Sequence, residues 1–347
     1  MNVCKKSLAL CLTLMMLASL AACGGDQEPD ETPAEEPVTL RVAALKGPTA
    51  MGMVKLMDDS KPVTEAVEEE HEDVGTSGNL YDFTLAASAD EVTPLLIQGE
   101  LDMACVPANL ASVLYNRTKG EIVTLAVNTL GVLYMVENGN AVQSLADLKG
   151  KTIVAAGKGS TPEYALRYLL SENGIDPDAD VVIDWKSEHS ECVAALATGA
   201  ATIALLPQPF VTAACAQNEK LSIVLDLTKE WEALQGEGGS RLVTGVTVVR
   251  NEFLKENPPV IDTFLTEHAA SAAFANEKPE ETSQLIAAAG IIEKAPVAQK
   301  ALPYCNIVCL TGEEMKSALS GYLQVLFDQD AKSVGGKLPG DEFYYIQ

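Results

Sequence analysis

The sequence contains few basic residues, few histidines and few aromatic residues, and each shortage argues against a class of function. Its 347 residues include 24 Lys and Arg but 49 Asp and Glu, so the formal charge at pH 7 is −25. Nucleic-acid binding by counterion release requires a basic surface, so nucleic acid is not expected as a partner. Three histidines are too few for a histidine-rich metal scavenger. Aromatic residues make up 5 %, with Trp185 and Trp231 as the two tryptophans, which disfavours a large groove for stacking sugars.

The chain does have the length and the apolar content of a folded protein of moderate size. At about 150 residues per domain, its length predicts two domains. Apolar residues make up 47 % and charged residues 21 %, which are ordinary values for a globular protein with a sizeable core.

Residues 1–23 carry the features of a bacterial lipoprotein signal. Lys5 and Lys6 precede an apolar run, residues 8–20, which is shorter than an ordinary transmembrane helix. The run leads into Leu-Ala-Ala before Cys23. This resembles a lipobox, in which the cysteine is diacylated on sulfur and the chain is cleaved on its amino side. We expect residues 1–22 to be a signal peptide and Cys23 to be lipidated; the alternative is an ordinary secretory signal with a chance cysteine.

Residues 23–37 are expected to form an acidic, disordered tether. After Cys23 they read GGDQEPDETPAEEP, with no apolar periodicity. Two or three acyl chains on one residue hold a protein at a membrane. We therefore expect a lipid-anchored protein on the extracytoplasmic face of a bacterial cell membrane. A second run of acids, residues 65–73, is interpreted as a solvated face rather than a calcium site.

Five cysteines remain after the tether, and their number is odd, so they cannot all pair. Cys305 and Cys309 form a lone CxxxC without a second pair or a neighbouring histidine. A metal site is therefore not expected there. The alternatives left open are buried small residues or a local disulfide.

Short apolar strands alternate with short helices along the rest of the chain, which is typical of an α/β protein with parallel strand pairing. Strands are expected at residues 38–45, 81–88, 101–106, 121–129, 132–136, 151–156, 181–185, 201–206, 221–227 and 242–250. Helices are expected at residues 49–57, 90–98, 109–116, 144–148, 161–172, 187–198 and 209–217. After Asn251 the chain is predicted to be nearly all helix to about residue 327, including residues 259–275 and 313–327.

The pattern restarts at Leu130, which predicts two α/β lobes, each a mainly parallel sheet flanked by helices, and a helical C-terminal region. Lobe I comprises residues 38–129 plus 246–347, and lobe II comprises residues 130–245. A lobe that is interrupted by another requires two passages of the chain between them. We expect these near residues 128–131 and 244–247.

The candidate binding residues come from loops that follow strands. In open α/β sheets, ligands bind beyond the carboxyl ends of strands, where helix N-termini present free N–H groups. The relevant loops here are residues 46–51, the turns before two short helices, residues 157–163 and residues 207–210. The predicted ligand-binding residues are Lys46, Gly47, Pro48, Thr49, Ala50, Met51, Ser88, Asp90, Asn109, Lys158, Gly159, Ser160, Thr161, Gln208 and Phe210.

Local signals predict how three of these helices begin. Ser88 has capping-box spacing, but Pro94 favours a start near Asp90, which makes Asp90 the expected cap. Asn109 is expected to cap the following helix. Ser160 and Glu163 again have the spacing of a capping box. Each of these turns can also be an ordinary helix cap that binds no ligand.

Specific roles are predicted for a few of the candidate residues. Lys46 and Lys158 lie beside helix N-termini in a very acidic chain, so they either attract an anionic group or are simply exposed lysines. Thr49 and Ser160 are predicted to donate N–H and hydroxyl hydrogen bonds to the ligand. Phe210 or Trp185 is expected to stack on a planar ligand.

Catalytic motifs are weak in this sequence. It has no GxSxG and no HExxH, and Lys158 is followed by glycine rather than by the Ser or Thr of a Walker A motif. His189, beside two glutamates, could bind a ligand or relay protons, or it is a surface histidine at a helix end. We therefore predict no catalytic residue, no cofactor and no metal.

Three segments resemble one family. They are the KGPT that ends the first strand at residues 46–49, the GELDMA at 99–104 and the LADLKGK at 145–151. Together with the lipobox and the tether, they resemble the solute-binding lipoproteins of ABC importers. Within these, the chain is similar to the nitrate, sulfonate, taurine and thiamine-precursor group, which has the type II periplasmic-binding fold. The resemblance covers about residues 38–347 and is not specific for a ligand.

The resemblance implies a transport mechanism in which the protein makes and breaks no covalent bonds. A small polar or anionic solute bridges two lobes, closure is stabilised by contacts of the closed state, and the closed form docks on a membrane permease with its ATPase. The resemblance also implies a monomer that is not an enzyme. Two alternatives of other classes remain: a ligand-sensing lipoprotein for a membrane receptor, or an extracytoplasmic enzyme that uses His189 or a thiol.

Overall fold

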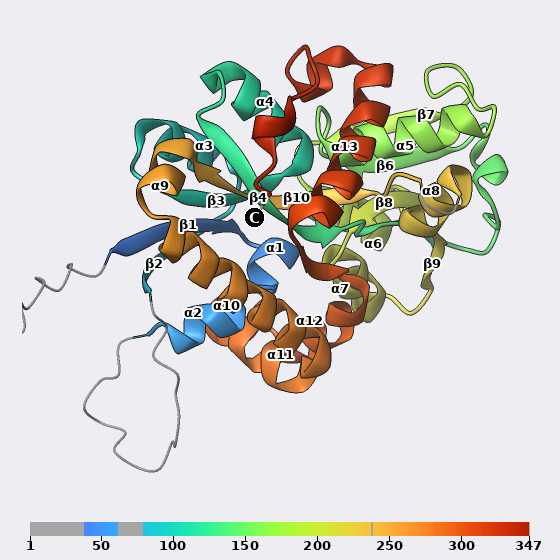
Figure 1. Ribbon diagram of the computed structural model, residues 1–347. Helices are drawn as coiled ribbons and strands as arrows, with labels where there is room; N and C mark the ends of the chain where they lie inside the picture. Colours follow the sequence, from blue (N-terminus) through green and yellow to red (C-terminus); the bar gives the residue numbers. More distant parts are fainter. Residues whose placement is uncertain (1–37, 62–78, 237–238, 347) are drawn as a thin grey trace, which may run out of the picture. The chain divides into compact units, whose positions relative to one another are not determined.

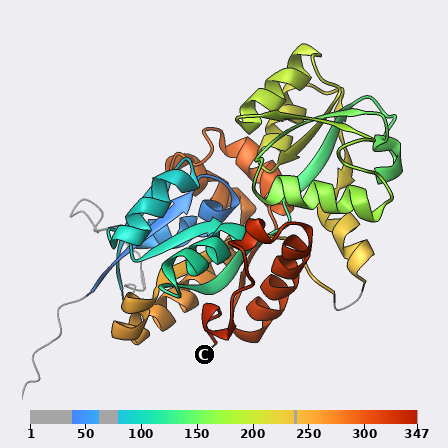
Figure 2. The same ribbon diagram turned by 90° about the horizontal axis from the view of Figure 1, so that it is seen from above.

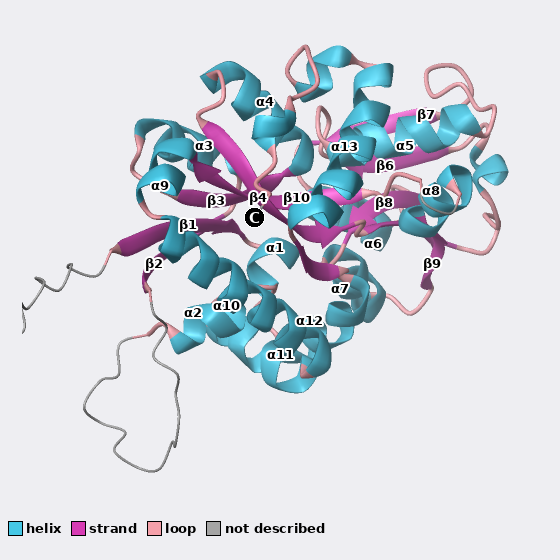
Figure 3. Cartoon of the chain, in the orientation of Figure 1, coloured by secondary structure: helices cyan, strands magenta, loops and turns pink. Residues whose placement is uncertain are grey.

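The computed structural model describes residues 38–61, 79–236 and 239–346 (Figure 1). The expected signal peptide, Cys23, the acidic tether and the charged run at residues 65–73 lie outside the described residues. Within them, two separate sheets are surrounded by helices (Figure 3). The α/β class expected from the sequence is confirmed.

The first sheet is built from both ends of the described chain. Its strands are β1 (Thr39–Leu45), β2 (Leu80–Ala86), β3 (Met103–Pro107), β4 (Ile122–Leu130), β10 (Val243–Arg250) and β11 (Ile307–Leu310). Their spatial order is β11, β4, β10, β3, β1, β2. β1 to β4 run in one direction, and β10 and β11 run in the other.

The second sheet uses the middle of the chain. Its strands are β5 (Leu133–Asn138), β6 (Thr152–Ala156), β7 (Val182–Lys186), β8 (Ile203–Pro207) and β9 (Leu221–Asp226). Their spatial order is β7, β6, β8, β5, β9. β5 alone among these described strands runs against the others, so most strands of each sheet share a direction.

Helices connect the strands and complete the C-terminal part. Those next to the first sheet are α1 (Pro48–Met51), α2 (Val54–Asp59), α3 (Ala89–Gln98), α4 (Ala108–Thr118), α9 (Asn251–Glu256), α10 (Pro258–Glu277), α11 (Pro279–Ala288), α12 (Ala295–Ala301) and α13 (Gly312–Gln329). Those next to the second sheet are α5 (Thr161–Glu172), α6 (His189–Thr198), α7 (Phe210–Gln217) and α8 (Leu227–Gln235). Short 3-10 turns are η1 (Leu145–Leu148), η2 (Leu302–Tyr304), η3 (Ala331–Val334) and η4 (Asp341–Phe343).

Side chains alternate along the strands, so each sheet packs helices on both faces. In β1, Leu40 and Val42 are buried on the face of α2 and α10, whereas Ala43 lies on the face of α3 and α4. β6 shows the same alternation. Its even-numbered apolar residues pack with α6 and α7, and its odd-numbered ones with α5.

One apolar cluster continues from the first sheet into the second. It includes Val127 of β4 and Val246 of β10, Met135 of β5, and Leu319 and Tyr322 of α13. α13 packs against both α4 and α5, and it lies beside α5 in both views (Figures 1 and 2). The C-terminal helix therefore buries side chains from both halves of the fold.

The structure differs from the expected pattern in several places. α8 was not expected, and it forms because Asp226 accepts hydrogen bonds from two N–H groups of its first turn and Trp231 is buried in the core. β11 interrupts a region expected to be helical, because its run of four apolar residues pairs with the edge of β4. β5, β10 and β11 are antiparallel to their neighbours rather than parallel. Residues 244–247 lie inside β10, so the second passage between the sheets comes before them.

The first passage between the sheets allows a direct test through Gly131. This buried residue follows β4, and a Cβ at its position would overlap Thr228 Oγ1 and lie 2.9 Å from Leu242 Cδ2. We expect Gly131→Ala to lower the free energy of unfolding by about 1–3 kcal/mol, the usual cost of overpacking, as measured by urea denaturation. Gly340→Ala is the matched control, because its Cβ meets the flexible end of the Glu342 side chain. Equal stability of the Gly131 and Gly340 variants would contradict close packing at this passage.

A buried histidine makes stability depend on pH. His268 of α10 is fully buried, and burial lowers its pKa from the ordinary 6.5 to about 4. The unfolded chain therefore binds a proton at a higher pH than the folded chain does. The contribution to stability is complete above about pH 6.5 and is lost as the pH falls toward 4, by about 1.4 kcal/mol per pH unit.

Substitution of His268 tests this dependence. In His268→Gln we expect the fall in unfolding free energy between pH 7 and pH 5 to be smaller than in the wild type, as measured by urea denaturation at both values. His189→Gln is the comparison variant, because burial lowers the pKa of His189 to about 4 as well. Parallel pH dependences for the wild type and both variants would contradict the assignment of neutral, buried imidazoles.

Candidate functional site

The chain passes between the two sheets twice, after β4 and before β10. In each sheet, both connections lie at the same edge. The last residue of β4, Leu130, pairs with the first residue of β10, Val243. The first residue of β5, Leu133, pairs with the last residue of β8, Pro207, and β9 also ends at this edge. The passages therefore join the edge formed by the carboxyl ends of β1 to β4 to the edge formed by the carboxyl ends of β6 to β8. This is the place where ligands bind in open α/β sheets.

The loop after β1 lies at this edge of the first sheet. Lys46 is exposed, and its N–H donates to the Ala86 carbonyl at the end of β2 at 2.9 Å. The Thr49 hydroxyl donates to the Leu45 carbonyl at 2.9 Å, so it is already used within the loop. The Gly47 carbonyl accepts the N–H groups of the last two residues of α1. Within the described residues, the Lys46 ammonium group and the N–H groups of Gly47 and Thr49 are the donors that this loop retains for another group.

Two residues predicted from this loop belong to the core. The side chains of Ala50 and Met51 are fully buried, Ala50 against the face of α10 and Met51 against α11 and α12. Their N–H groups donate to the Gly47 carbonyl. Gly47 itself has a φ of 144°, a conformation that favours glycine, and Pro48 begins α1. The apolar spacing that predicted a helix here also predicts this burial.

The start of α3 differs from the expected one. Its N-cap is Ser88, not Asp90, and Asp90 lies inside the first turn. The Ser88 hydroxyl donates to the Glu91 carboxylate at 3.1 Å. Pro94 lies inside the helix, which continues because Val92 and Leu96 on one face are buried in the core. The steric argument from Pro94 was therefore outweighed by tertiary packing.

Asn109 is not a cap either. α4 begins one residue earlier, with Pro107 at the N-cap, and Asn109 is buried in the first turn. Its amide nitrogen donates to the Ser333 carbonyl at 3.3 Å, and its amide oxygen has no partner among the described residues. The C-terminal segment that covers this helix face, at Ser333, could not be inferred from local sequence.

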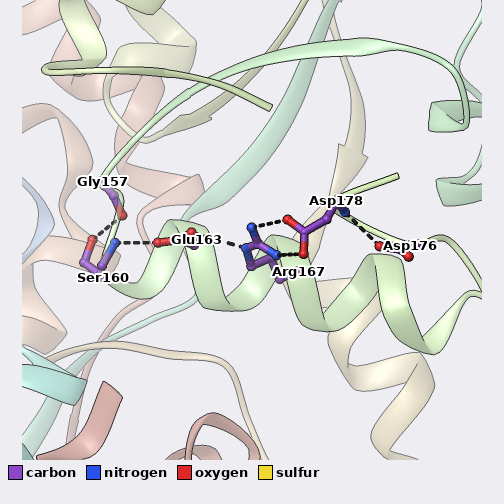
Figure 4. A network of polar contacts seen from close by, with 7 residues as sticks. Gly157, Ser160, Glu163, Arg167, Asp176 and Asp178 are labelled. Carbon is purple, nitrogen blue, oxygen red and sulfur yellow. Dashed lines mark hydrogen bonds and ion pairs between the residues drawn. The ribbon is translucent and has the colours of Figure 1, made fainter. Parts of the chain in front are cut away.

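The loop after β6 forms a tight polar network at the edge of the second sheet (Figure 4). Gly157 has a φ of 88°, and the Ser160 hydroxyl donates to its carbonyl at 2.8 Å. The Ser160 N–H donates to the same carbonyl at 3.1 Å. The Gly159 N–H donates to a Glu163 carboxylate oxygen at 2.7 Å. The expected capping box does not form, because Glu163 binds Gly159 instead of the N-cap residue.

Glu163 is held from its other side by an arginine. Arg167 Nε donates to the second Glu163 oxygen at 3.2 Å, and its two terminal nitrogens donate to Asp178 at 3.1 and 2.7 Å (Figure 4). The guanidinium lowers the pKa of Asp178 below its ordinary value. The network fixes the loop and holds the Glu163 carboxylate in place beside the start of α5.

These contacts determine which donors of the second edge remain free. The N–H and the hydroxyl of Ser160 are both used inside the loop, contrary to the expected role of Ser160 as a donor to ligand. The N–H of Thr161, the first residue of α5, has no acceptor among the described residues. Lys158 is exposed next to it, and neither Lys158 nor Lys46 forms an ion pair within the described part of the chain. Of the predicted residues Ser160 and Thr161, it is thus Thr161 whose N–H stays available within the described residues.

Gln208 supplies a further donor at the end of β8. It is 1 % exposed, and its amide oxygen accepts from the N–H and the hydroxyl of Thr212 at 3.3 and 2.9 Å. These donors fix the orientation of the amide, so its nitrogen faces away from them. That nitrogen is buried and has no partner among the described residues. A buried donor without an acceptor is unusual and points to a group that completes it.

Phe210, two residues after Gln208, packs against His189. Phe210 begins α7, and its ring centroid is 5.3 Å from that of His189, which begins α6. Burial keeps His189 neutral, and its Nδ1 is buried without a described partner. Trp185 is half-buried near the carboxyl end of β7. The edge of the second sheet therefore carries neutral donors and aromatic rings in addition to Lys158 and to Lys186, which pairs with Asp184.

The cysteines do not form a reactive centre. The five described cysteines are free, including Cys305 and Cys309. Burial raises the pKa of the Cys105 and Cys309 thiols to about 12 and that of Cys192 to about 11. At neutral pH these thiols are protonated and are poor nucleophiles.

In the described ranges, no group of three or more His, Cys, Asp or Glu residues is arranged to hold a metal ion. No helix of these ranges has the length and apolarity to cross a membrane.

The structure therefore brings the candidate residues to two edges. Lys46 to Thr49, Ser88, Asp90 and Asn109 follow β1, β2 and β3, which are neighbours in the first sheet. Lys158 to Thr161, Gln208 and Phe210 follow β6 and β8, which are neighbours in the second. Sequence reasoning missed Tyr322 of α13, whose hydroxyl contacts Thr161. No local signal marks Tyr322, because it is 161 residues away from Thr161 in the sequence.

Solved structures with this fold include binding proteins of several ABC importers. An ABC transporter structure from Parabacteroides distasonis has a TM-score of 0.72 and 23 % identity, over 88 % of this chain and 98 % of that one. The periplasmic aliphatic sulphonate binding protein SsuA of Escherichia coli has a TM-score of 0.66 and 16 % identity, over 88 % and 93 %. The periplasmic nitrate-binding protein NrtA of Synechocystis has a TM-score of 0.52 and 13 % identity, over 73 % and 66 %. The expected type II periplasmic-binding fold is confirmed.

The sequence itself also matches a family model, although no curated protein matches it. The model describes the periplasmic substrate-binding protein of phosphonate ABC transporters, and it matches residues 53–252, more than half of the chain. The expected resemblance to the solute-binding proteins of ABC importers is thus confirmed, and these relatives are transport proteins rather than enzymes. The chain belongs to the family of periplasmic substrate-binding proteins of phosphonate ABC transporters.

Proposed function

We propose that this protein captures a small oxyanion-bearing solute and delivers it to a membrane permease and its ATPase. The observation that carries the proposal is the set of free donors at the edge of the second sheet, namely the Thr161 N–H and the buried Gln208 amide nitrogen. Both lie at the ends of neighbouring parallel strands. Phosphonate, sulfonate and nitrate, which are named for the family and for the similar structures, share an oxyanion group. Such a group accepts hydrogen bonds from donors of this kind.

Two exposed lysines support an anionic solute. Lys46 and Lys158 lie beside the two facing edges and form no ion pair among the described residues. The helix that starts at Thr161 has 12 residues, so its N-terminus adds a partial positive charge. Glu163 would oppose an anion, and its pairing with Arg167, which is shared with Asp178, reduces this effect. Lys46, Lys158 and the helix N-terminus therefore support an anion locally although the whole chain is acidic.

Binding is proposed to occur between two lobes, each formed by one sheet and its helices. In this proposal the lobes are residues 38–129 plus 246–347 and residues 130–245, and β4 and β10 extend a few residues past these limits. A solute that contacts both edges favours the closed arrangement, because only that arrangement makes all its contacts. The closed form is then the one that the permease accepts.

Titration of the purified protein with methylphosphonate, methanesulfonate, taurine and nitrate tests the proposal. A solute at about a thousand times its dissociation constant adds about 4 kcal/mol to the free energy of unfolding, which raises the melting temperature by several degrees.

We expect Gln208→Glu to weaken binding at least tenfold, because it replaces the free donor with a carboxylate oxygen and keeps the acceptor for Thr212. Gln217→Glu is the control, since Gln217 is exposed at the far end of α7. Unchanged affinity in Gln208→Glu would contradict this site.

We also propose that Cys23 carries the lipid that anchors the protein on the extracytoplasmic face of the membrane. We expect Cys23→Ser to abolish metabolic labelling with palmitate and to move the protein from the membrane fraction to the soluble extracytoplasmic fraction. Cys11→Ser is the control, because Cys11 lies within the expected signal peptide. Persistent palmitate labelling of the Cys23 variant would overturn the anchor assignment.

A further inference from the structure

A tyrosine from the C-terminal helix contacts the residue that begins α5. The Tyr322 hydroxyl of α13 lies 3.0 Å from Thr161 Oγ1. Tyr322 is fully buried, and Thr161 is 2 % exposed. α13 also packs against β4 and α4 of the first sheet, so this contact links the start of a second-sheet helix to the first half of the fold.

The direction of this hydrogen bond determines what Thr161 can do. Tyr322 donates, and the Thr161 oxygen accepts. A hydroxyl that accepts one hydrogen bond still has its own hydrogen to donate. Among the described residues, no acceptor receives that hydrogen or the Thr161 N–H. Thr161 therefore retains two adjacent donors at the carboxyl end of β6.

Tyr322 is held rigidly by an aromatic cluster that consists of Tyr168, Trp231 and Tyr322. The Trp231 ring centroid is 5.7 Å from that of Tyr322 and 4.7 Å from that of Tyr168. Trp231 is fixed in turn by its indole N–H, which donates to the Ser240 carbonyl at 3.1 Å. The phenol oxygen of Tyr322 thus has one well-defined position relative to Thr161.

A second observation points to a ligand group at the end of the neighbouring strand. Gln208 directly follows the neighbouring strand β8, and its amide nitrogen is buried without a described partner. Three donors from two adjacent strand ends, the N–H and O–H of Thr161 and the Gln208 amide, therefore lack acceptors. One oxyanion has enough lone pairs to accept all three.

We propose that Tyr322 is a positioning residue for oxyanion binding, which it directs by donating to Thr161 so that the Thr161 hydroxyl donates to the solute. This inference rests on the function proposed above. The chain of hydrogen bonds runs from Tyr322 to Thr161 to the solute, and each donor in such a chain strengthens the next. Without the Tyr322 hydroxyl, the Thr161 hydroxyl loses the partner that holds its oxygen and can turn away from the solute.

The experiment compares four variants by titration with methylphosphonate, methanesulfonate and nitrate. Tyr322→Phe removes the hydroxyl and keeps the ring, and Tyr168→Phe is the matched control from the same aromatic cluster. Thr161→Val removes the hydroxyl that accepts from Tyr322 and is proposed to donate to the solute. Thr161→Ser keeps this hydroxyl. We expect Tyr322→Phe and Thr161→Val to weaken binding at least tenfold, whereas Tyr168→Phe and Thr161→Ser stay close to the wild type. Urea denaturation of each variant shows whether it is folded at the titration temperature.

The double variant separates positioning from a structural role. If Tyr322 acts through Thr161, Tyr322→Phe has no further effect on affinity in a Thr161→Val background. Additive losses, or full affinity in Tyr322→Phe, would overturn the positioning role and leave the proposed function in place. If the wild type binds none of the three anions, the proposed function is itself overturned, and the positioning role falls with it.

Discussion

The antiparallel pairing of β4 with β10 is the constraint on which the rest of the arrangement depends. The two strands meet where Leu130 pairs with Val243, and beyond this pair both chain segments leave the first sheet. Because the second sheet receives them at the edge where β6, β7 and β8 end, strand ends of both sheets lie next to the same two connections. The helices that follow these strands start there too, and their free N–H groups converge without any need for a specialised loop. A buried glycine, Gly131, lets the first connection pass close to Thr228 and Leu242.

A second constraint comes from the C-terminal helix α13. It shares one apolar cluster with both sheets, so relative movement of the two halves has to conserve this packing. Motions that separate α13 from α5 would expose the buried Tyr322 and break its hydrogen bond to Thr161. Rotations about the two connections between the sheets conserve this packing more easily. The helix thus connects Thr161, a residue of the proposed site, to the other half of the fold.

Local signals predicted those parts of the structure that local physics determines. α5 begins and ends where the sequence indicates, since Pro162 fits its first turn and apolar residues recur on one face. The failures share a cause: at α3, α4 and β11, contacts with distant segments outweighed the local preference. The same distinction between local and distant contacts applies to the residues of the candidate site. The loops at the strand ends were predictable from the α/β pattern, whereas the donors left free depend on where Glu163 and Tyr322 point. Those orientations come from partners such as Arg167 and Trp231, and no spacing in the sequence encodes them.

The strong negative charge of the chain and an anionic solute are compatible because charge acts locally. Exposed charges more than about 8 Å apart are largely screened at physiological salt, so most acidic residues on the surface do not oppose binding at the strand ends. Glu163 is an acidic group at the loop before α5, and it is compensated by the Gly159 N–H and by Arg167. Arg167 is shared with Asp178, so the arginine nearest to this loop is occupied in holding acids rather than free for the solute. In the proposed site, recognition therefore depends on neutral donors and a helix N-terminus, with Lys46 and Lys158 as exposed charges nearby. On this proposal, an oxyanion is bound through directed hydrogen bonds, and selectivity comes from which donors are free rather than from the number of positive charges.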